Sequence, residues 1–226
     1  MLLHLSFLFL RGKISCDFMR FLLYLLRLYW KGMTKIMATE KQSNHELYSW
    51  LRTLVCVVIG TVLLFTLVLR IVRVDGPSMR DTLQDGDILL AVSRQLSGGL
   101  EAGDIVIVKK EYFDNGKPIV KRIIATEGQT VDIDFDEGVV YVDDVALEED
   151  YILEPTYLEE GMQFPVTVPE NSFFLLGDNR NDSLDSRSPD LGTVDEREVI
   201  GKAVLLVIPG KTADVGKRDF GRIGGL

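Results

Sequence analysis

Histidine and cysteine are nearly absent from this sequence, and the few that occur lie near its start. Its two histidines and two cysteines all precede residue 57. The rest of the chain therefore has no imidazole and no thiol, which excludes a Ser-His-Asp triad, a disulfide and a thiolate metal site there. Only lysines and carboxylates remain in that stretch as plausible general bases.

Positive charge is also scarce after residue 73. Of 25 Lys and Arg residues and 34 Asp and Glu residues, ten basic and three acidic ones lie within 1–73. Residues 74–226 therefore carry 15 basic and 31 acidic side chains, a formal charge of −16. Proteins that bind nucleic acid need a basic footprint, so nucleic acid is excluded as a partner.

One long uncharged run extends from Thr53 to Leu69. Continued through Val72, it reaches the roughly 20 residues that a membrane-spanning helix needs, so we predict a transmembrane helix over 53–72. The run is longer than the apolar part of a cleavable secretory signal, and no small-x-small motif follows it. Both features favour an uncleaved anchor in the lipid bilayer.

Basic residues in front of this run orient the predicted anchor. Lys31, Lys35 and Lys41 precede it, and Lys and Arg are enriched on the cytoplasmic side of membrane spans. We therefore expect a single-pass protein of the cell membrane, with its N-terminus and a segment over 37–52 in the cytoplasm. The domain over 73–209 is then extracytoplasmic.

Residues 1–36 form a separate basic and apolar segment. Charged residues interrupt it, so no window approaches the roughly 20 apolar residues of a spanning helix. Two interpretations remain open: an interfacial segment, or an upstream extension that is not translated, with initiation at Met33 or Met37. We favour the second, because Met37 opens a polar stretch of the kind that precedes an anchor.

After residue 86 the pattern is that of a β domain, with short apolar runs between clusters of Gly, Asp and Asn. The clearest runs are 87–92, 104–108, 119–125, 173–176 and 202–208. Thr130 to Phe135 alternates and then turns into Val139 to Val142, which predicts a hairpin. We predict a single all-β unit, a sandwich or barrel-like sheet, followed by a flexible glycine-rich tail over 210–226.

Without histidine, lysine becomes the candidate base. Lys121 and Lys202 lie within or beside apolar strands. Burial removes water from the ammonium group, lowers the pKa and makes the neutral amine available as a base. Lys121 is the better candidate because apolar residues surround it, although the local pattern alone favours an ordinary strand lysine that faces solvent.

A serine needs a base before it can attack, so a Ser-Lys pair is the minimal chemistry available. Ser78 follows Gly76-Pro77, a tight turn that exposes the hydroxyl and leaves backbone N–H groups nearby for an oxyanion. An ordinary turn serine is the alternative. The polar stretch 177–187 is either a solvated turn or a buried network, in which Asp185 pairs with Arg187 and a hydroxyl orients the amine.

Six motifs occur in order between Val74 and Ile208. They are Gly76-Pro77-Ser78-Met79 with Thr82-Leu83, Gly86-Asp87, Gly103-Asp104-Ile105-Val106, Val120-Lys121-Arg122-Ile123-Ile124, Gly177-Asp178-Asn179-Arg180 with Ser183, Asp185, Ser186 and Arg187, and Ile200-Gly201-Lys202. In this order, behind a predicted anchor, they make the chain resemble the bacterial type I signal peptidases. These are membrane-anchored serine proteases that remove signal peptides from exported preproteins.

This resemblance implies a mainly antiparallel β catalytic core of the signal-peptidase and LexA type, with a variable β-ribbon insert over 128–170. The implied roles are nucleophile for Ser78, general base for Lys121, amine-binding hydroxyl for Ser183, structural ion pair for Asp185 and Arg187, buttress for Asp178 and Arg180, and substrate pocket for Met79. The implied substrates are signal peptides cut after small-x-small sites, with the secretion translocase nearby. No metal or organic cofactor is implied.

Gly76 departs from part of the family pattern, since Gram-negative members usually have a serine there that completes the oxyanion hole. The hole must then rest mainly on the Ser78 N–H, and the chain looks more like Gram-positive members. Two other interpretations stay open. A LexA-type self-cleaving repressor should bring a helix-turn-helix and a basic face, and a tethered β binding module should have lost Ser78 or Lys121.

Overall fold

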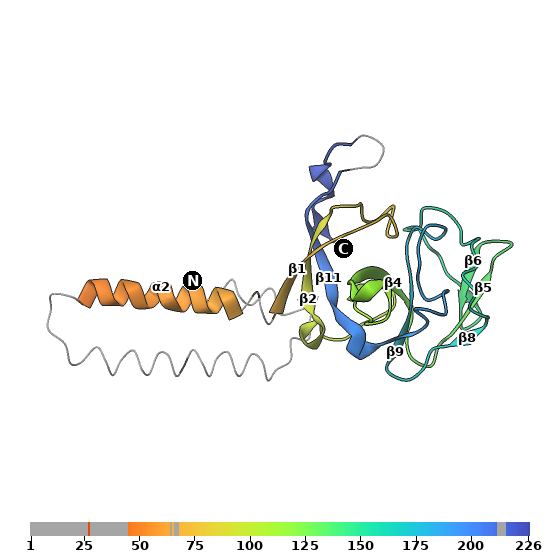
Figure 1. Cartoon of the computed structure of the whole chain (residues 1–226), viewed down its shortest axis with the longest axis horizontal. Helices are drawn as coiled ribbons and strands as arrows, with labels where there is room; N and C mark the ends of the chain where they lie inside the picture. The colour runs from red at the N-terminus through yellow and green to blue at the C-terminus, as the bar shows by residue number, and fades with distance from the viewer. Residues whose placement is uncertain (1–26, 28–44, 64, 66–67, 212–215) are drawn as a thin grey trace. The chain divides into compact units, whose positions relative to one another are not determined.

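The computed structural model describes residues 27, 45–63, 65, 68–211 and 216–226 (Figure 1). The predicted extension over 1–36, apart from residue 27, and residues 37–44 of the predicted cytoplasmic segment lie outside the described residues. The chain divides into two compact units, Met1–Leu69 with Gln95–Gly99 and Arg70–Arg94 with Leu100–Leu226.

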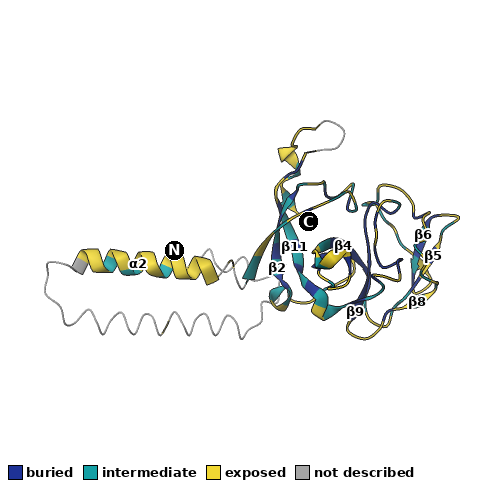
Figure 2. Ribbon diagram, viewed as in Figure 1, coloured by how far each residue is buried: buried dark blue, intermediate teal, exposed yellow. Residues whose placement is uncertain are grey.

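The first unit contains helix α2, His45–Leu63, whose surface is largely exposed (Figure 2). Its residues Glu46–Leu63 have a mean hydropathy of 1.5, and none of that stretch is buried within the protein. An exposed helix of this length and composition fits a membrane span. The predicted span of 53–72 overlaps this helix but differs in its bounds, because the helix begins earlier, at His45, and residues 69–72 belong to a strand; residues 64, 66 and 67 lie outside the described part.

Strand β1, Leu69–Arg73, occupies the end of the predicted anchor. Arg70 interrupts the apolar run, and the β-branched Ile71 and Val72 favour a strand over a helix. Counting uncharged residues therefore placed the boundary too late. The chain changes from helix to sheet before the apolar character ends.

The second unit is built on an eight-stranded sheet with the order β1-β2-β11-β3-β4-β9-β10, in which β12 also pairs with β11. Its other strands are β2 Ile88–Ser93, β3 Ile105–Val108, β4 Ile119–Ala125, β9 Ser172–Leu176, β10 Val194–Asp195, β11 Val199–Ile208 and β12 Gly224–Gly225. Short 3-10 helices are η3 Arg94–Leu96, η4 Asp114–Gly116, η5 Glu196–Glu198 and η6 Phe220–Arg222. The pairs β11–β3, β3–β4 and β4–β9 are antiparallel, which confirms the predicted mainly β fold.

A smaller four-stranded sheet has the order β7-β6-β5-β8. It consists of β5 Thr130–Asp134, β6 Val139–Val142, β7 Val145–Ala146 and β8 Val166–Thr167. The predicted hairpin is confirmed, since β5 and β6 pair antiparallel with Val131 opposite Val142. All four strands lie between residues 128 and 170, the range predicted for the insert.

The core of the second unit continues beneath the residues around Ser78. Val74, Met79 and Leu83 are buried and pack with Leu89 and Ile107 of the large sheet. A second buried cluster joins the small sheet to the large one through Val131, Val140 and Phe174. Burial of these side chains supplies the hydrophobic free energy that fixes both the segment after β1 and the insert.

The tail differs from its prediction. Gly224 and Gly225 of β12 pair with Leu206 and Leu205 of β11, and η6 precedes them. The predicted flexible tail over 210–226 is therefore wrong for residues 216–226; residues 212–215 lie outside the described part. Glycine richness suggested a loop, but the backbone of these two glycines still forms ladder hydrogen bonds with β11.

Candidate active site

Ser78 lies on a loop between β1 and β2 whose two ends are joined. The Val74 N–H donates to the Asp87 carbonyl oxygen at 2.8 Å, and the Gly86 N–H donates to the Val74 oxygen at 2.9 Å. Gly76 has a φ of +98°, a conformation that favours glycine, and its N–H donates to Asp85 Oδ1 at 3.0 Å. These bonds define the nucleophile loop, residues 75–87, as a closed structure.

Met79 anchors this loop from below. Its side chain is 1% exposed and belongs to the apolar cluster beneath the loop. The resemblance places Met79 beside the substrate pocket, whereas its side chain here packs into the core. Its evident contribution is to hold the neighbouring Ser78, which is half-buried.

Lys121 reaches Ser78 from strand β4. Its Nζ donates to Ser78 Oγ at 2.8 Å, and the residue is only 3% exposed. The interpretation of Lys121 as an ordinary strand lysine that faces solvent is therefore wrong. A buried amine bonded to a serine hydroxyl is the geometry that activates serine as a nucleophile.

The surroundings of Lys121 alter its acidity. Burial lowers its pKa from 10.5 to about 8, while the carboxylates of Asp185, Glu160 and Asp178 act in the opposite direction. The nearby Arg187 lowers the pKa further. At pH 7 roughly a tenth of the amine is then neutral and able to accept a proton.

The polar loop, residues 177–187, is a buried network. Asp178, Arg180, Asp185 and Arg187 are each fully buried, so the solvated-turn interpretation is wrong. The loop also binds the backbone around the nucleophile, because the Asn179 N–H donates to the Ser78 carbonyl oxygen at 3.0 Å. It thereby fixes both the serine and the surroundings of the lysine.

Asp185 and Arg187 form the ion pair that the sequence suggested. Arg187 Nε lies 2.9 Å from Asp185 Oδ1, and Arg187 Nη2 lies 2.9 Å from Oδ2. Glu160 joins them: its Oε1 lies 3.2 Å from Arg187 Nη2, and its Oε2 accepts the Asp185 N–H at 3.2 Å. Two parallel charge-assisted bonds between a guanidinium and a carboxylate neutralise both charges and also fix how the two side chains are oriented.

The hydroxyl of Ser183 has a partner that the resemblance did not imply. Its Oγ donates to Asp185 Oδ2 at 2.8 Å, whereas the resemblance implied a bond with the Lys121 amine. A carboxylate is a stronger acceptor than an amine that already carries hydrogens, so the hydroxyl turns toward Asp185. In this structure, Ser183 orients the carboxylate that acts on Lys121.

Asp178 and Arg180 buttress the site through different partners. Arg122 donates two parallel hydrogen bonds to the Asp178 carboxylate, from Nε to Oδ1 at 2.9 Å and from Nη2 to Oδ2 at 2.7 Å. Asp178 Oδ2 also accepts a hydrogen bond from the Thr82 hydroxyl at 2.5 Å. Arg180 pairs with Glu149 at 2.6 Å. Thr82 thus ties the nucleophile loop to the polar loop.

Two of these partners, Glu149 and Glu160, were not singled out from the sequence, and two others, Thr82 and Arg122, stood in the motifs without an assigned role. Arg122 carried a weak signal, since it is a charge within an apolar strand. Glu149 and Glu160 carried none, because acidic residues are common throughout the domain. Within the described residues, no group of three or more histidine, cysteine or carboxylate side chains is arranged to hold a metal ion.

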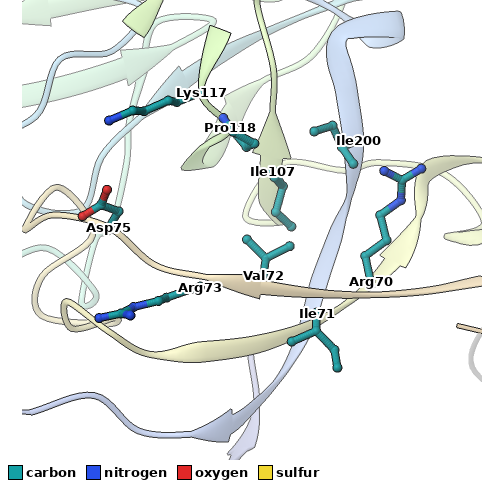
Figure 3. Close-up of a pocket in the computed structure, with 9 residues that line it drawn as sticks. All are labelled: Arg70, Ile71, Val72, Arg73, Asp75, Ile107, Lys117, Pro118 and Ile200. Carbon is teal, nitrogen blue, oxygen red and sulfur yellow. The ribbon is translucent and has the colours of Figure 1, made fainter. Parts of the chain in front are cut away.

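A groove of about 880 Å³ lies beside β1 (Figure 3). Its lining residues are Arg70, Ile71, Val72, Arg73, Asp75, Ile107, Lys117, Pro118 and Ile200. Val72, Ile107 and Ile200 give it an apolar floor, and charged side chains surround them (Figure 3). Neither Ser78 nor Lys121 lines the groove, but Asp75 and Pro118 each precede one of them by three residues.

Comparison with known proteins assigns the class. A family model described as signal peptidase, peptidase S26, matches residues 47–208. The chain therefore belongs to the signal peptidase family. This membership, together with the mainly antiparallel β fold, makes it a peptidase.

Individual relatives agree with this assignment. Signal peptidase I of Bacillus licheniformis is 31% identical over 183 residues, which cover 76% of this chain and 96% of the relative. Signal peptidase I U of Bacillus subtilis strain 168 is 34% identical over 143 residues, 60% of this chain and 74% of the relative. A crystal structure of a signal peptidase I from Enterococcus faecalis V583 is 32% identical and aligns 46% of this chain with 96% of that chain, at a TM-score of 0.38.

Proposed function

We propose that this protein is a membrane-anchored serine endopeptidase that removes signal peptides from exported preproteins by a Ser-Lys mechanism. The observation that carries the proposal is the 2.8 Å bond from the buried Lys121 amine to Ser78 Oγ. Family membership supports the substrate class, signal peptides cut after small-x-small sites. Residues 57–226 contain no histidine and no cysteine, so besides lysine the carboxylates are the plausible general bases there.

The proposed reaction depends on the Lys121 amine changing between its neutral and its protonated form. Neutral Lys121 takes the Ser78 proton as Oγ attacks the scissile carbonyl carbon, and the resulting ammonium returns a proton to the departing amine of the mature protein. The signal peptide is then held as an ester on Ser78. Lys121 next takes a proton from water, whose oxygen attacks the ester carbon; the bond to Ser78 Oγ breaks, the ammonium returns the proton to Oγ, and the signal peptide leaves with a free carboxylate.

The oxyanion of each tetrahedral intermediate needs N–H donors. Gly76 offers no side chain, and its own N–H is bound to Asp85. We assign the Ser78 N–H as the principal donor. The nucleophile loop, held closed at Val74, pre-organises that donor.

The groove beside β1 is the proposed path of the substrate. Strand β1 lies at the end of the sheet order, and the edge of a sheet can accept an extended peptide as an added strand. The apolar floor suits small apolar side chains, and the end at Asp75 leads along the chain toward Ser78. An extended peptide with small residues before the cut fits such a track.

Helix α2 provides the proposed anchor in the cell membrane. Basic residues before it favour a cytoplasmic N-terminus and an extracytoplasmic peptidase domain in a single-pass arrangement. Tethering both enzyme and preprotein to one bilayer raises their effective concentration. The site of action is then close to the secretion translocase, from which preproteins emerge.

A preprotein cleavage assay with the full chain in detergent or vesicles tests this function. Ser78→Ala removes the nucleophile and should lower turnover at least about 10³-fold. Ser172→Ala is the matched control, because Ser172 begins β9 and its hydroxyl bonds the Glu170 carbonyl oxygen two residues earlier, rather than Ser78 or Lys121; it should stay within about twofold of wild type. Near-wild-type cleavage by Ser78→Ala would refute the proposal.

A further inference from the structure

The last residues of the chain bind the nucleophile loop. Strand β12 is paired with β11, and the η6 turn before it is capped by Asp219, whose Oδ1 accepts the Gly221 N–H at 2.9 Å. This folded tail places Arg222 beside Asp87. The guanidinium is thus held by secondary structure on both sides.

Asp87 is a buried carboxylate at the closed end of the loop. It is 0% exposed, and Arg222 donates to it through Nη2 at 2.8 Å and through Nη1 at 3.2 Å. It also accepts the N–H groups of Gly210 at 2.6 Å and Gln84 at 2.8 Å. A carboxylate buried this deeply needs a counter-charge, and Arg222 provides one.

Arg222 also contacts the interior of the loop. Its Nη2 donates to the Thr82 carbonyl oxygen at 3.0 Å. Thr82 is the residue whose hydroxyl bonds Asp178, and Asp178 in turn holds Arg122, the neighbour of Lys121. The Arg222 guanidinium therefore bonds the nucleophile loop at two points: at Asp87, where the loop closes, and at Thr82, four residues after Ser78.

We propose that Arg222 is a positioning residue for the peptidase reaction. By holding Asp87 and Thr82, it sets the distance and direction of Ser78 Oγ relative to Lys121 Nζ. The inference rests on the proposed function for its kinetic part. It links the C-terminal tail to the geometry of the active site through the nucleophile loop, although none of the described tail residues bonds Ser78 or Lys121.

The kinetic test compares two arginines of the same tail in the full chain. Arg222→Gln should lower kcat about tenfold or more and leave KM within about twofold, because Arg222 does not line the groove. Arg218→Gln removes the same charge from an exposed position and should leave both constants within about twofold of wild type. Arg222→Lys, which keeps the charge and loses the fork, should fall between them.

A double variant separates positioning from simple charge neutralisation. Asp87→Asn combined with Arg222→Gln leaves no unpaired buried charge, so its thermal stability should return toward that of wild type. Its kcat should stay low, because the bond to the Thr82 carbonyl is still missing. Recovery of kcat together with stability would overturn the proposal.

Amide hydrogen exchange tests the loop without any cleavage. In Arg222→Gln the Leu83 and Gly86 amides should exchange at least about tenfold faster, while Arg218→Gln leaves them unchanged. Unchanged exchange in Arg222→Gln contradicts the proposal. Full cleavage by Ser78→Ala would instead refute the proposed function and leave the exchange result standing, so the two failures are distinguishable.

Discussion

Two lysines flank the same residue of the central sheet and have different surroundings. Val106 of β3 is opposite Lys121 of β4 on one side and opposite Lys202 of β11 on the other. Lys202 Nζ lies 2.5 Å from Asp104 Oδ1, and 29% of its side chain is exposed. Lys121 is almost fully buried and donates to Ser78 instead.

The difference shows that loops, more than the strand position, determine which lysine becomes a base. The nucleophile loop and the polar loop enclose Lys121, and loss of water is the largest influence on its pKa. Lys202 keeps a carboxylate partner and contact with solvent. Equivalent places in a sheet therefore give one candidate base and one ordinary ion pair.

Removing each amine should give the largest contrast. Lys121→Met keeps the length and apolar stem of the side chain but removes the proton acceptor, so preprotein turnover should fall at least about 10³-fold. Lys202→Met should stay within about threefold of wild type. The rate of cleavage in the preprotein assay measures both, and equal losses in the two variants would contradict the assignment of Lys121 as the base.

Opening the enclosure around Lys121 should have the next largest effect. A Cβ at Gly177 would lie 2.5 Å from the Ser78 carbonyl oxygen and also against Ser183 Oγ. Gly177→Ala should therefore push the polar loop away from the nucleophile loop, admit water and lower kcat about 100-fold. Gly60→Ala, where the new methyl meets nothing within 4 Å, is the control, and similar losses in both variants would argue against this enclosure.

The pH dependence should follow the acidity of Lys121. Because the neutral amine is the active form, kcat/KM should rise with pH through an apparent pKa of about 8. The Glu160 carboxylate raises the pKa of Lys121, so Glu160→Gln should move the rise to lower pH by about half a unit. A profile that shifts upward in this variant would show that Glu160 does not act on the amine.

Stability should depend on pH through the same group. The folded-state pKa of Lys121, about 8, lies below its ordinary 10.5, so between these values the unfolded chain binds more protons. The free energy of unfolding should therefore rise with pH across that window, by on the order of 3 kcal/mol from this residue. Thermal unfolding of wild type and Lys121→Met at several pH values measures this, and parallel curves would contradict it.

The smallest effect should come from a substitution of Asp104, the carboxylate that pairs with Lys202. Asp104→Asn breaks the ion pair with Lys202, which is partly exposed to solvent. The expected cost is about 0.5–1 kcal/mol in the free energy of unfolding, with cleavage unchanged. Denaturant unfolding gives the first quantity, and a loss of cleavage would mean that the two sides of β3 are coupled.

Much of the strand pattern could be predicted because apolar runs were bounded by turn residues. The hairpin that begins at Thr130 and the short strand around Ile107 were predicted in this way. Ser78 and Lys121 became candidates because the chain offers no histidine near them. Their pairing across 43 positions of sequence came from the resemblance, since local pattern favoured a solvent-facing lysine.

The remaining features depend on contacts between distant segments. Glu160 and Glu149 come from the insert, and Arg222 comes from the tail. Each pairs with a buried residue far away in the sequence, and no local sequence pattern predicts these pairs. Among 34 acidic residues, nothing distinguishes those that become buried. The orientation of the Ser183 hydroxyl likewise depends on the neighbouring Asp185 carboxylate, which the resemblance alone did not reveal.

The bonds from Asn179 to the residues around the nucleophile also bear on biosynthesis. Its N–H and side-chain amide hold the carbonyl oxygens of Ser78 and Pro77, about a hundred residues earlier in the chain. A ribosome that has made Ser78 and Lys121 has not yet made the groups that hold and enclose them. These bonds to Ser78 and Pro77 therefore cannot form until the chain has been synthesised through Asn179.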